Sequence, residues 1–378
     1  MHQTTLKLLK ELIEMPSVFP REERIAVFCS DFLKKNGFDV ELTPVENNRH
    51  NLIATKGSQK KCILLFGHLD TVPPYNYNKN PYKMSIKGDK ISGLGSWDMK
   101  SGLAIIMSAA SKIQLKGIGL KIVFSVDEEN NSLGSHIVYN KKFLENVVLA
   151  ITPEIIDDVD KSEDGNTILL GRRGRAVYEI EVIGIAGHGA ALKGISAISV
   201  ASEIIQFAER LKLKKDRFLG NCSIFIRKIT GESTSLSLPE KCLIYLDVHY
   251  TPPYTQDNLI QIISKQLEEK FYYYLTKGVR ISIRIAKRNT PYLKPYVTDR
   301  NNVYVKKVLS LLSNKIRNLK VSAGLTVADE NIVGNFGVPV ITIGPRGGEA
   351  HSSGEWVSKK SIGEIEKIYI STINLLTK

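Results

Sequence analysis

A histidine and an aspartate stand two residues apart just after the apolar run Cys62–Phe66. Side chains two positions apart on a strand point to the same face, so His68 and Asp70 are expected to face the same way. A histidine at a strand end can bind a metal ion while a nearby carboxylate orients its imidazole. The pair therefore predicts half of a metal site, with His68 as a ligand and Asp70 supporting catalysis by orienting it.

Two acidic segments downstream can complete such a site. Asp98 closes the turn Gly93–Asp98, whose glycines permit the tight backbone that pushes Asp98 forward. A phosphate-binding loop is the competing interpretation, but the Walker spacing is absent and Asp98 would repel a phosphate. Asp127, Glu128 and Glu129 follow an apolar strand, where one carboxylate can bind a cation while its neighbour moves protons. A solvated acidic turn is the alternative for this triplet.

A second glycine-rich loop near the C-terminus carries His351, directly after the predicted strand Val338–Gly344. An isolated histidine is more often structural or exposed, but ligand-binding residues concentrate at such strand ends in open α/β sheets. The resulting ligand set is His68, Asp98, Glu129 and His351. This histidine–carboxylate set suits one or two Zn²⁺ ions per chain, with Co²⁺ or Mn²⁺ as alternatives.

The same residues describe a hydrolytic reaction. Two metal ions sharing Asp98 would lie about 3.5–4 Å apart and acidify a water for attack on an amide carbonyl. Glu128 is the predicted general base, which takes the proton from this water and passes it to the leaving amine. His188 lies in a glycine-rich turn in the middle of the chain. It is either a plain turn residue or a group that stabilises the developing oxyanion.

Composition restricts the class of protein. The chain has 378 residues, with 43% hydrophobic and 24% charged residues, which is typical of a globular protein of two domains. No apolar stretch is long enough to cross a bilayer, and the N-terminus lacks the apolar core of a signal peptide, so we expect a cytoplasmic protein. The four cysteines lack metal-binding spacing, and a Cys222–Cys242 disulfide is not favoured.

The net charge of +13 is the unusual bulk property. It is compatible with nucleic-acid binding, with an anionic substrate, or with a generally basic surface. The lysines are scattered, no nucleic-acid motif occurs, and aromatic residues do not alternate with basic runs. We therefore expect a small-molecule substrate, and neither a nucleic-acid nor a membrane partner.

The hydrophobic pattern predicts an α/β fold interrupted by a second domain. In the flanking parts we expect helices at Leu6–Met15, Glu23–Asn36 and Lys100–Leu115, and strands at Cys62–His68, Leu120–Val126, Val147–Thr152 and Val338–Gly344. In the middle we expect strands at Ala176–Ile185, Cys222–Thr230, Lys241–Tyr250 and Val279–Ala286, and helices at Ala197–Leu213 and Gln256–Leu275. This β-α-β-β-α-β order is ferredoxin-like. The predicted domains are a discontinuous catalytic domain, 1–175 with 287–378, and an inserted domain, 176–286.

Over nearly its whole length the chain resembles the cocatalytic dizinc metallopeptidase family, which contains glutamate carboxypeptidase, acetylornithine deacetylase, succinyl-diaminopimelate desuccinylase and aminoacylase. The resemblance implies a zinc-peptidase-like α/β sandwich with a lid that also forms a homodimer. It implies that Asp98 bridges two metals and precedes a cis peptide, that Glu128 and Glu129 are base and ligand, and that His351 is the C-terminal ligand. His188 matches a lid histidine that enters the partner's active site in related dimers.

The sequence departs from this family pattern at three places. Thr152 stands before a proline where the family has a carboxylate ligand, and threonine is a poor zinc ligand, so either Glu154 substitutes or one metal site is weak. Leu236 stands where the family's Asn-Val-x-Pro stretch has asparagine. His249 stands where an arginine is usual, so Arg346, or the arginines of the segment 171–175, would have to bind a substrate carboxylate.

These observations favour a metal-dependent amide hydrolase, a zinc metallopeptidase or amidohydrolase. The first interpretation is a carboxypeptidase that releases a C-terminal amino acid from small peptides or N-acyl amino acids. The alternative is an N-deacylase of the acetylornithine deacetylase type. A third interpretation, a degraded relative that binds a ligand without catalysis, rests on Thr152.

Overall fold

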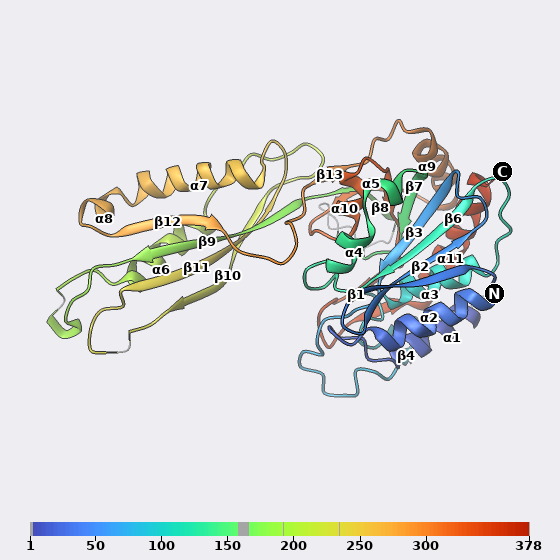
Figure 1. The fold of residues 1–378 in the computed structure, drawn as a ribbon, viewed down its shortest axis with the longest axis horizontal. Coiled ribbons are helices and arrows are strands. Elements are labelled where there is room, and N and C mark those ends of the chain that lie inside the picture. The colour runs from blue at the N-terminus through green and yellow to red at the C-terminus, as the bar shows by residue number, and fades with distance from the viewer. Residues whose placement is uncertain (1–2, 158–165, 192, 234, 378) are drawn as a thin grey trace. The chain divides into compact units, whose positions relative to one another are not determined.

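The computed structural model describes residues 3–157, 166–191, 193–233 and 235–377, and the chain folds into two compact units (Figure 1). The first unit contains Met1–Arg172, Tyr296–Gly324 and Ala328–Lys378. The second contains Arg173–Pro295 with Leu325–Val327. The first unit is therefore assembled from segments that flank the second in the sequence.

A nine-stranded mixed sheet forms the centre of the first unit, in the order β1-β2-β6-β3-β7-β15-β8-β13, with β14 paired to β8. The strands are β1 (Asp39–Glu46), β2 (Arg49–Lys56), β3 (Cys62–His68), β6 (Gly119–Ser125), β7 (Val147–Thr152), β8 (Thr167–Arg172), β13 (Tyr296–Val297), β14 (Lys320–Gly324) and β15 (Val340–Thr342). Strand β3 runs parallel to β6 and β7, and β15 runs parallel to β7. The carboxyl ends of these four strands therefore meet at one edge of the sheet, where the loops that follow them converge.

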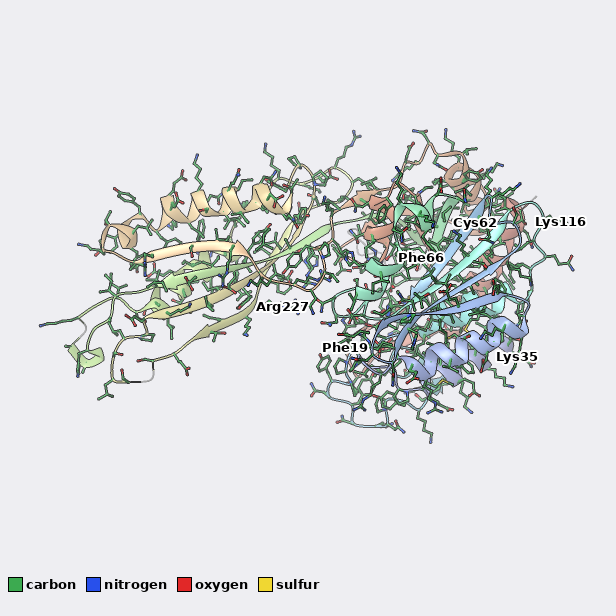
Figure 2. The ribbon with its side chains drawn as sticks, viewed as in Figure 1. Phe19, Lys35, Cys62, Phe66, Lys116 and Arg227 are labelled. Carbon is green, nitrogen blue, oxygen red and sulfur yellow. The ribbon has the colours of Figure 1, made fainter. Side chains whose placement is uncertain are left out.

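Helices flank this sheet, and α3 is the most buried of them (Figure 1). The helices of the unit are α1 (Gln3–Ile13), α2 (Glu23–Lys35), α3 (Lys100–Ala110), α4 (Leu133–Val138), α5 (Lys141–Leu144), α9 (Val303–Lys315), α10 (Glu330–Asn335) and α11 (Lys359–Leu376). All eleven residues of α3 are buried, because its glycine, alanine and serine residues allow α1, α11 and β3 to approach closely. Strand β3 is buried along its whole length, and Figure 2 labels two of its residues, Cys62 and Phe66.

A small four-stranded sheet lies beside the functional loops, in the order β16-β17-β5-β4. Its strands are β4 (Ser85–Lys87), β5 (Lys90–Ser92), β16 (Gly347–Gly348) and β17 (Trp356–Ser358). Because β5 pairs with β17, the turn that follows β5 and the loop that precedes β17 begin side by side. These two loops carry Asp98 and His351.

The second unit follows the β-α-β-β-α-β order, with an antiparallel sheet ordered β10-β11-β9-β12. Its elements are β9 (Gly174–Ile183), the 3₁₀ turn η1 (Gly189–Ala191), α6 (Ala197–Glu209), β10 (Ser223–Gly231), β11 (Lys241–Tyr250), α7 (Gln256–Lys270), α8 (Tyr272–Thr276) and β12 (Arg280–Ile285). Alternate residues of the central strands, such as Tyr178 and Ile180, pack with α6 and α7 into one apolar core. This core allows the unit to bury apolar surface of its own.

The predicted α/β fold is confirmed, but strands β1, β2 and β8 were not among the expected elements, and two expected helices are shorter in the structure. Helix α3 ends at Ala110 rather than at Leu115, and α6 ends at Glu209 rather than at Leu213. All four cysteines are free thiols, so Cys222 and Cys242 form no disulfide in this structure. Among the described helices, none combines the length and apolarity that a bilayer crossing requires.

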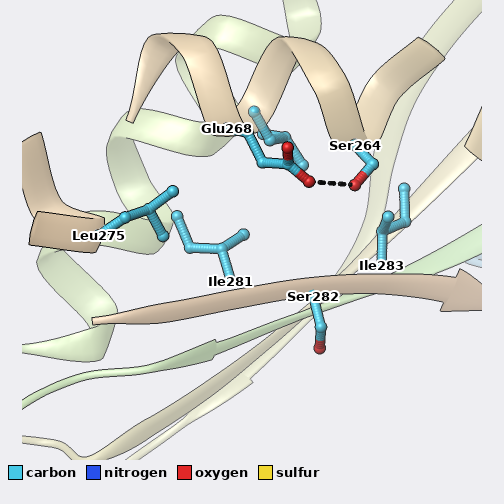
Figure 3. Close-up of a pocket in the computed structure, with 7 residues that line it drawn as sticks. Ser264, Glu268, Leu275, Ile281, Ser282 and Ile283 are labelled. Atoms are coloured by element: carbon cyan, nitrogen blue, oxygen red, sulfur yellow. Dashed lines mark hydrogen bonds between the residues drawn. The ribbon is translucent and has the colours of Figure 1, made fainter. Parts of the chain in front are cut away.

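A small cavity in the second unit lies between α7 and β12 (Figure 3). It is lined by Leu267, Leu275, Ile281 and Ile283 and is closed on one side by the hydrogen bond from Ser264 to Glu268. Its volume of about 10 Å³ is the space of roughly one water molecule. This cavity is too small for a substrate, and the groups capable of chemistry gather elsewhere, in the first unit.

Candidate metal centre

The centre of the site is Asp98, whose two carboxylate oxygens face two different histidines. Asp98 Oδ1 lies 3.2 Å from His68 Nε2, and Asp98 Oδ2 lies 3.1 Å from His351 Nε2. The Asp98 side chain is buried, and the peptide bond to Met99 is cis, as the family resemblance implied. A carboxylate held between two imidazoles in this way could offer one oxygen to each of two cations.

His68 is held at the end of β3 by Asp70, through its main chain as well as its side chain. His68 Nδ1 donates a hydrogen bond to the Asp70 backbone carbonyl at 3.0 Å, while the Asp70 carboxylate is 3.6 Å away. A carbonyl oxygen can only accept, so Nδ1 carries the proton and Nε2 is the atom directed at Asp98. The Asp70 carboxylate also accepts the backbone N–H groups of Glu128 and Glu129, at 3.1 and 3.0 Å. Asp70 thus orients the histidine and anchors the acidic turn together.

The acidic turn after β6 is built around Asp127, which has a positive φ of 73°. Its carboxylate accepts hydrogen bonds from the Leu133 backbone and from Arg49 Nη2, at 3.1 and 3.2 Å. Arg49 also donates to Glu22 at 2.6 Å, and all three charged groups are buried. These contacts hold the Asp127 backbone in its strained conformation. This turn directs the carboxylates of Glu128 and Glu129 toward the site.

Each histidine at Asp98 has a second carboxylate beside it. Glu129 Oε2 lies 3.1 Å from His351 Nε2, and Glu154 Oε2 lies 3.5 Å from His68 Nε2. The chain after β7 therefore brings the Glu154 carboxylate beside His68. Glu128 stands in the same cluster, and its carboxylate makes no hydrogen bond to any described residue, which leaves it available to a ligand.

Burial and charge shift the pKa values of these groups in opposite directions. Burial alone would raise the pKa of Asp98, but hydrogen bonds from His351 and His68 lower it below its usual range. Hydrogen bonds to Asp98 and Glu129 raise the pKa of His351 to about 11. Burial raises the pKa of Glu128 well above its usual range, and the nearby negative charges of Asp329 and Glu129 add to this effect. The site concentrates more negative charge than its two histidines neutralise.

The donor set fits a divalent cation. Ligand atoms of His68, Asp98 and Glu129 all lie within 4.8 Å of one another. Glu129 Oε1 is buried and has no hydrogen-bond partner among the described residues, a costly situation that a cation would relieve. Imidazole nitrogens and carboxylate oxygens without thiolates are the ligands expected for zinc, cobalt or manganese.

Three buried groups near the site were given no role by reasoning from sequence. Glu355 accepts backbone hydrogen bonds from the turn that carries Asp98. Lys100 donates to the Met15 carbonyl at 2.8 Å, and burial lowers its pKa to about 7. Asp329 accepts from the hydroxyls of Ser125 and Ser135, and burial raises its pKa to about 6. For Glu355, its place four residues after His351 was the only signal in the sequence.

The predicted substrate-binding residues lie outside the cluster around Asp98. His188 is an exposed residue of the second unit, where its backbone pairs with Ser237. The Arg346 guanidinium lies 3.6 Å from Asp89, and its side chain is 45% exposed.

The arginines proposed as alternatives to Arg346 are engaged within the fold. Arg172 is buried against Glu330 and Asp157, at 2.9 and 2.8 Å. Arg175 binds Asp247 through two nitrogens.

The chain is similar to known proteins over nearly its whole length. The model of peptidase family M20/M25/M40 matches residues 64–375. The succinyl-diaminopimelate desuccinylase of Wolinella succinogenes is 24% identical, over 99% of this chain and 100% of its own length. The acetylornithine deacetylase of Buchnera aphidicola is 23% identical, over 96% and 95%. A solved tripeptidase from Staphylococcus aureus shares the fold, with a TM-score of 0.80 at 20% identity over 100% of this chain and 99% of its own. Since the family model covers most of the chain, the resemblance inferred from sequence is confirmed, and the chain belongs to peptidase family M20/M25/M40.

Proposed function

We propose that this protein is a metal-dependent hydrolase that cleaves an amide bond in a small substrate. The observation that carries the proposal is the division of the Asp98 carboxylate between two histidines, each with a further carboxylate beside it. His68 and Glu154 would hold one cation, His351 and Glu129 the other, and Asp98 both. Zn²⁺ is the proposed metal, with Co²⁺ or Mn²⁺ as substitutes.

The protein's own groups divide the remaining work. Bound metal ions would polarise the scissile carbonyl and lower the pKa of the attacking water. Glu128 accepts the proton of that water and returns it to the leaving amine, since its carboxylate is in the cluster but engaged by no described hydrogen bond. Asp70 keeps Glu128 in place through the backbone bond at 3.1 Å.

The substrate class has two candidates. A carboxypeptidase acting on small peptides or N-acyl amino acids is the first, inferred from the motif set of the chain. An N-deacylase is the second, and the similarity of the chain to a succinyl-diaminopimelate desuccinylase and an acetylornithine deacetylase favours it. His188 and Arg346 remain the proposed contacts to the substrate oxyanion and carboxylate; replacing His188 is expected to lower kcat, and replacing Arg346 is expected to raise KM.

One experiment tests the activity and separates the two classes. The purified protein is stripped with a chelator, reloaded with Zn²⁺, Co²⁺ or Mn²⁺, and incubated with N-acetyl and N-succinyl amino acids and with N-blocked dipeptides. Release of a free amine is measured against the stripped protein. Metal-dependent release is expected, and the preferred panel member assigns the class. If the loaded protein binds metal but hydrolyses no member, the non-catalytic ligand-binding interpretation replaces this one.

We also propose that the protein is a homodimer formed through the second unit. Strand β10 is an edge of its sheet, and Phe225 and Ile229 on this strand are 46% and 47% exposed. An edge strand with exposed apolar side chains can pair with a second copy of itself. Sedimentation is expected to show a dimer that Ile229→Lys weakens, and a wild-type monomer would contradict the proposal. A cytoplasmic location also remains part of the proposal, and cell fractionation tests it.

A further inference from the structure

Glu355 makes an unusual set of contacts for a carboxylate that is not itself in the ligand cluster. Its side chain is buried, and its Oε2 accepts the backbone N–H of Gly95 at 2.8 Å. Its Oε1 accepts the N–H groups of Trp97 and Asp98, at 2.7 and 3.0 Å. Three contacts therefore hold one short turn, and the last of them is to the backbone of Asp98.

These contacts join the two loops that carry ligands from distant parts of the sequence. Glu355 lies four residues after His351, and it accepts hydrogen bonds from the turn that ends in Asp98. Paired strands β5 and β17 bring only the bases of these loops together. The Glu355 contacts also hold the far ends of the two loops together, where His351 Nε2 and Asp98 Oδ2 are 3.1 Å apart.

A carboxylate suits this position because the turn presents only donors. An ionised carboxylate accepts through both oxygens, whereas an amide of the same shape would point an NH₂ group at one of the backbone N–H groups. Hydrogen bonds from backbone N–H groups to a charged acceptor are stronger than those between neutral groups.

We propose that Glu355 is a positioning residue for the metal centre: by fixing the Asp98 turn against the His351 loop, it sets the geometry with which Asp98 and His351 bind metal. This inference rests on the proposed function, because it concerns the same site. Partners of metal ligands typically affect metal affinity or activity by about 10–100-fold. A residue that only stabilised the fold would leave the metal affinity of the folded protein unchanged.

Glu366 provides a matched control. It is also a buried carboxylate of the first unit, and it accepts from Ser108 of helix α3 and from Lys112, two residues beyond that helix. Glu355→Gln and Glu366→Gln each remove one buried negative charge and keep the shape of the side chain. Both are expected to lower the unfolding temperature, and only Glu355→Gln is expected to weaken metal binding.

The experiment is a titration of the stripped full-length proteins with Zn²⁺ and Co²⁺ by calorimetry, together with the Co²⁺ absorption spectrum. Glu355→Gln is expected to bind about 10–100-fold more weakly than wild type with an altered spectrum, and Glu366→Gln within about twofold of wild type. Glu355→Asp keeps the charge but is one methylene too short to reach all three amides, so it should fall between them. It serves as the test variant if Glu355→Gln does not fold.

The outcomes separate this inference from the proposed function. Wild-type affinity in both folded Glu355 variants, with the wild-type protein binding metal, would overturn the positioning role alone. A wild-type protein that binds neither metal would overturn the metal centre and this inference together. Equal weakening in Glu355→Gln and Glu366→Gln would also reject the inference, because it would show a general effect of losing buried charge.

Discussion

Replacing Glu128 by glutamine tests the assignment of the general base most directly. The amide has the shape of the carboxylate but cannot accept the proton of the attacking water. Glu128 makes no side-chain hydrogen bond to a described residue, so the replacement removes no native contact. General-base catalysis is worth about 10²–10⁴-fold. The expected fall in kcat by this factor corresponds to about 2.7–5.5 kcal/mol in the activation free energy.

We also expect Glu128→Gln to change the stability of the metal-free protein, and the direction of this change follows from the raised pKa of Glu128. Burial raises the pKa of Glu128, so the folded protein holds this proton more tightly than the unfolded chain. Ionisation of Glu128 therefore lowers the stability of the metal-free protein as the pH rises above the unfolded value of about 4.5. Glu128→Gln removes this cost, so the metal-free variant should be at least as stable as wild type at pH 7.

The assay combines steady-state kinetics on the preferred substrate with metal analysis of the same samples. Glu364→Gln, an exposed glutamate on α11, is the control and should match wild type. Unaltered metal content with lost turnover supports the role of Glu128. Turnover within about twofold of wild type would refute it, since no other group in the cluster is assigned to move this proton.

Three further predictions follow from the contacts around the site. Glu154→Ala should reduce the metal content toward one ion per chain, as measured by elemental analysis, while Thr152→Ala should leave the metal content unchanged. The reverse result would show that Thr152, and not Glu154, is the ligand. Arg49→Met leaves two buried carboxylates unpaired and should cost about 3–5 kcal/mol in chemical denaturation, and a loss below about 1 kcal/mol would contradict the buried network. Because the pKa of His351 is raised to about 11 and that of His68 is also raised by its carboxylate neighbours, both are protonated in the metal-free protein at pH 7. Metal binding should therefore release about two protons or more and tighten as the pH rises, measured by calorimetry in buffers of different ionisation enthalpy, and a release below one proton would contradict these shifts.

The elements that position the site were largely predictable, because each is a buried segment with its own pattern. Strand β3 and helix α3 are mainly apolar, are buried along their whole length, and were expected from local sequence. The hairpin β1–β2 was not expected, because no residue of β1 is buried and the alternation of Val40 and Leu42 with Asp39 and Glu41 is short. Strand β8 is buried along its whole length, yet it too was missed.

The candidate ligands were identified from their residue types and from their positions at strand ends, but the residues that hold them in place were not. Arg49 lies 27 residues from Glu22 and 78 from Asp127, so no local pattern connects the three. Likewise, nothing in the order Ala150–Glu154 shows whether the chain turns back far enough for Glu154 to reach His68. The structure brings their side chains to 3.5 Å.

The sequence alone determined the family, the α/β class and the histidine–carboxylate set, because each depends on residue types at short spacings. Only the tertiary structure decided how the set is divided, with one Asp98 oxygen for each histidine, and which backbone groups hold it. The physical reason is that these contacts join chain segments up to about 260 residues apart. Their geometry is set by the parallel strands and paired loops that bring the segments together, so it cannot be inferred from any one segment of the sequence.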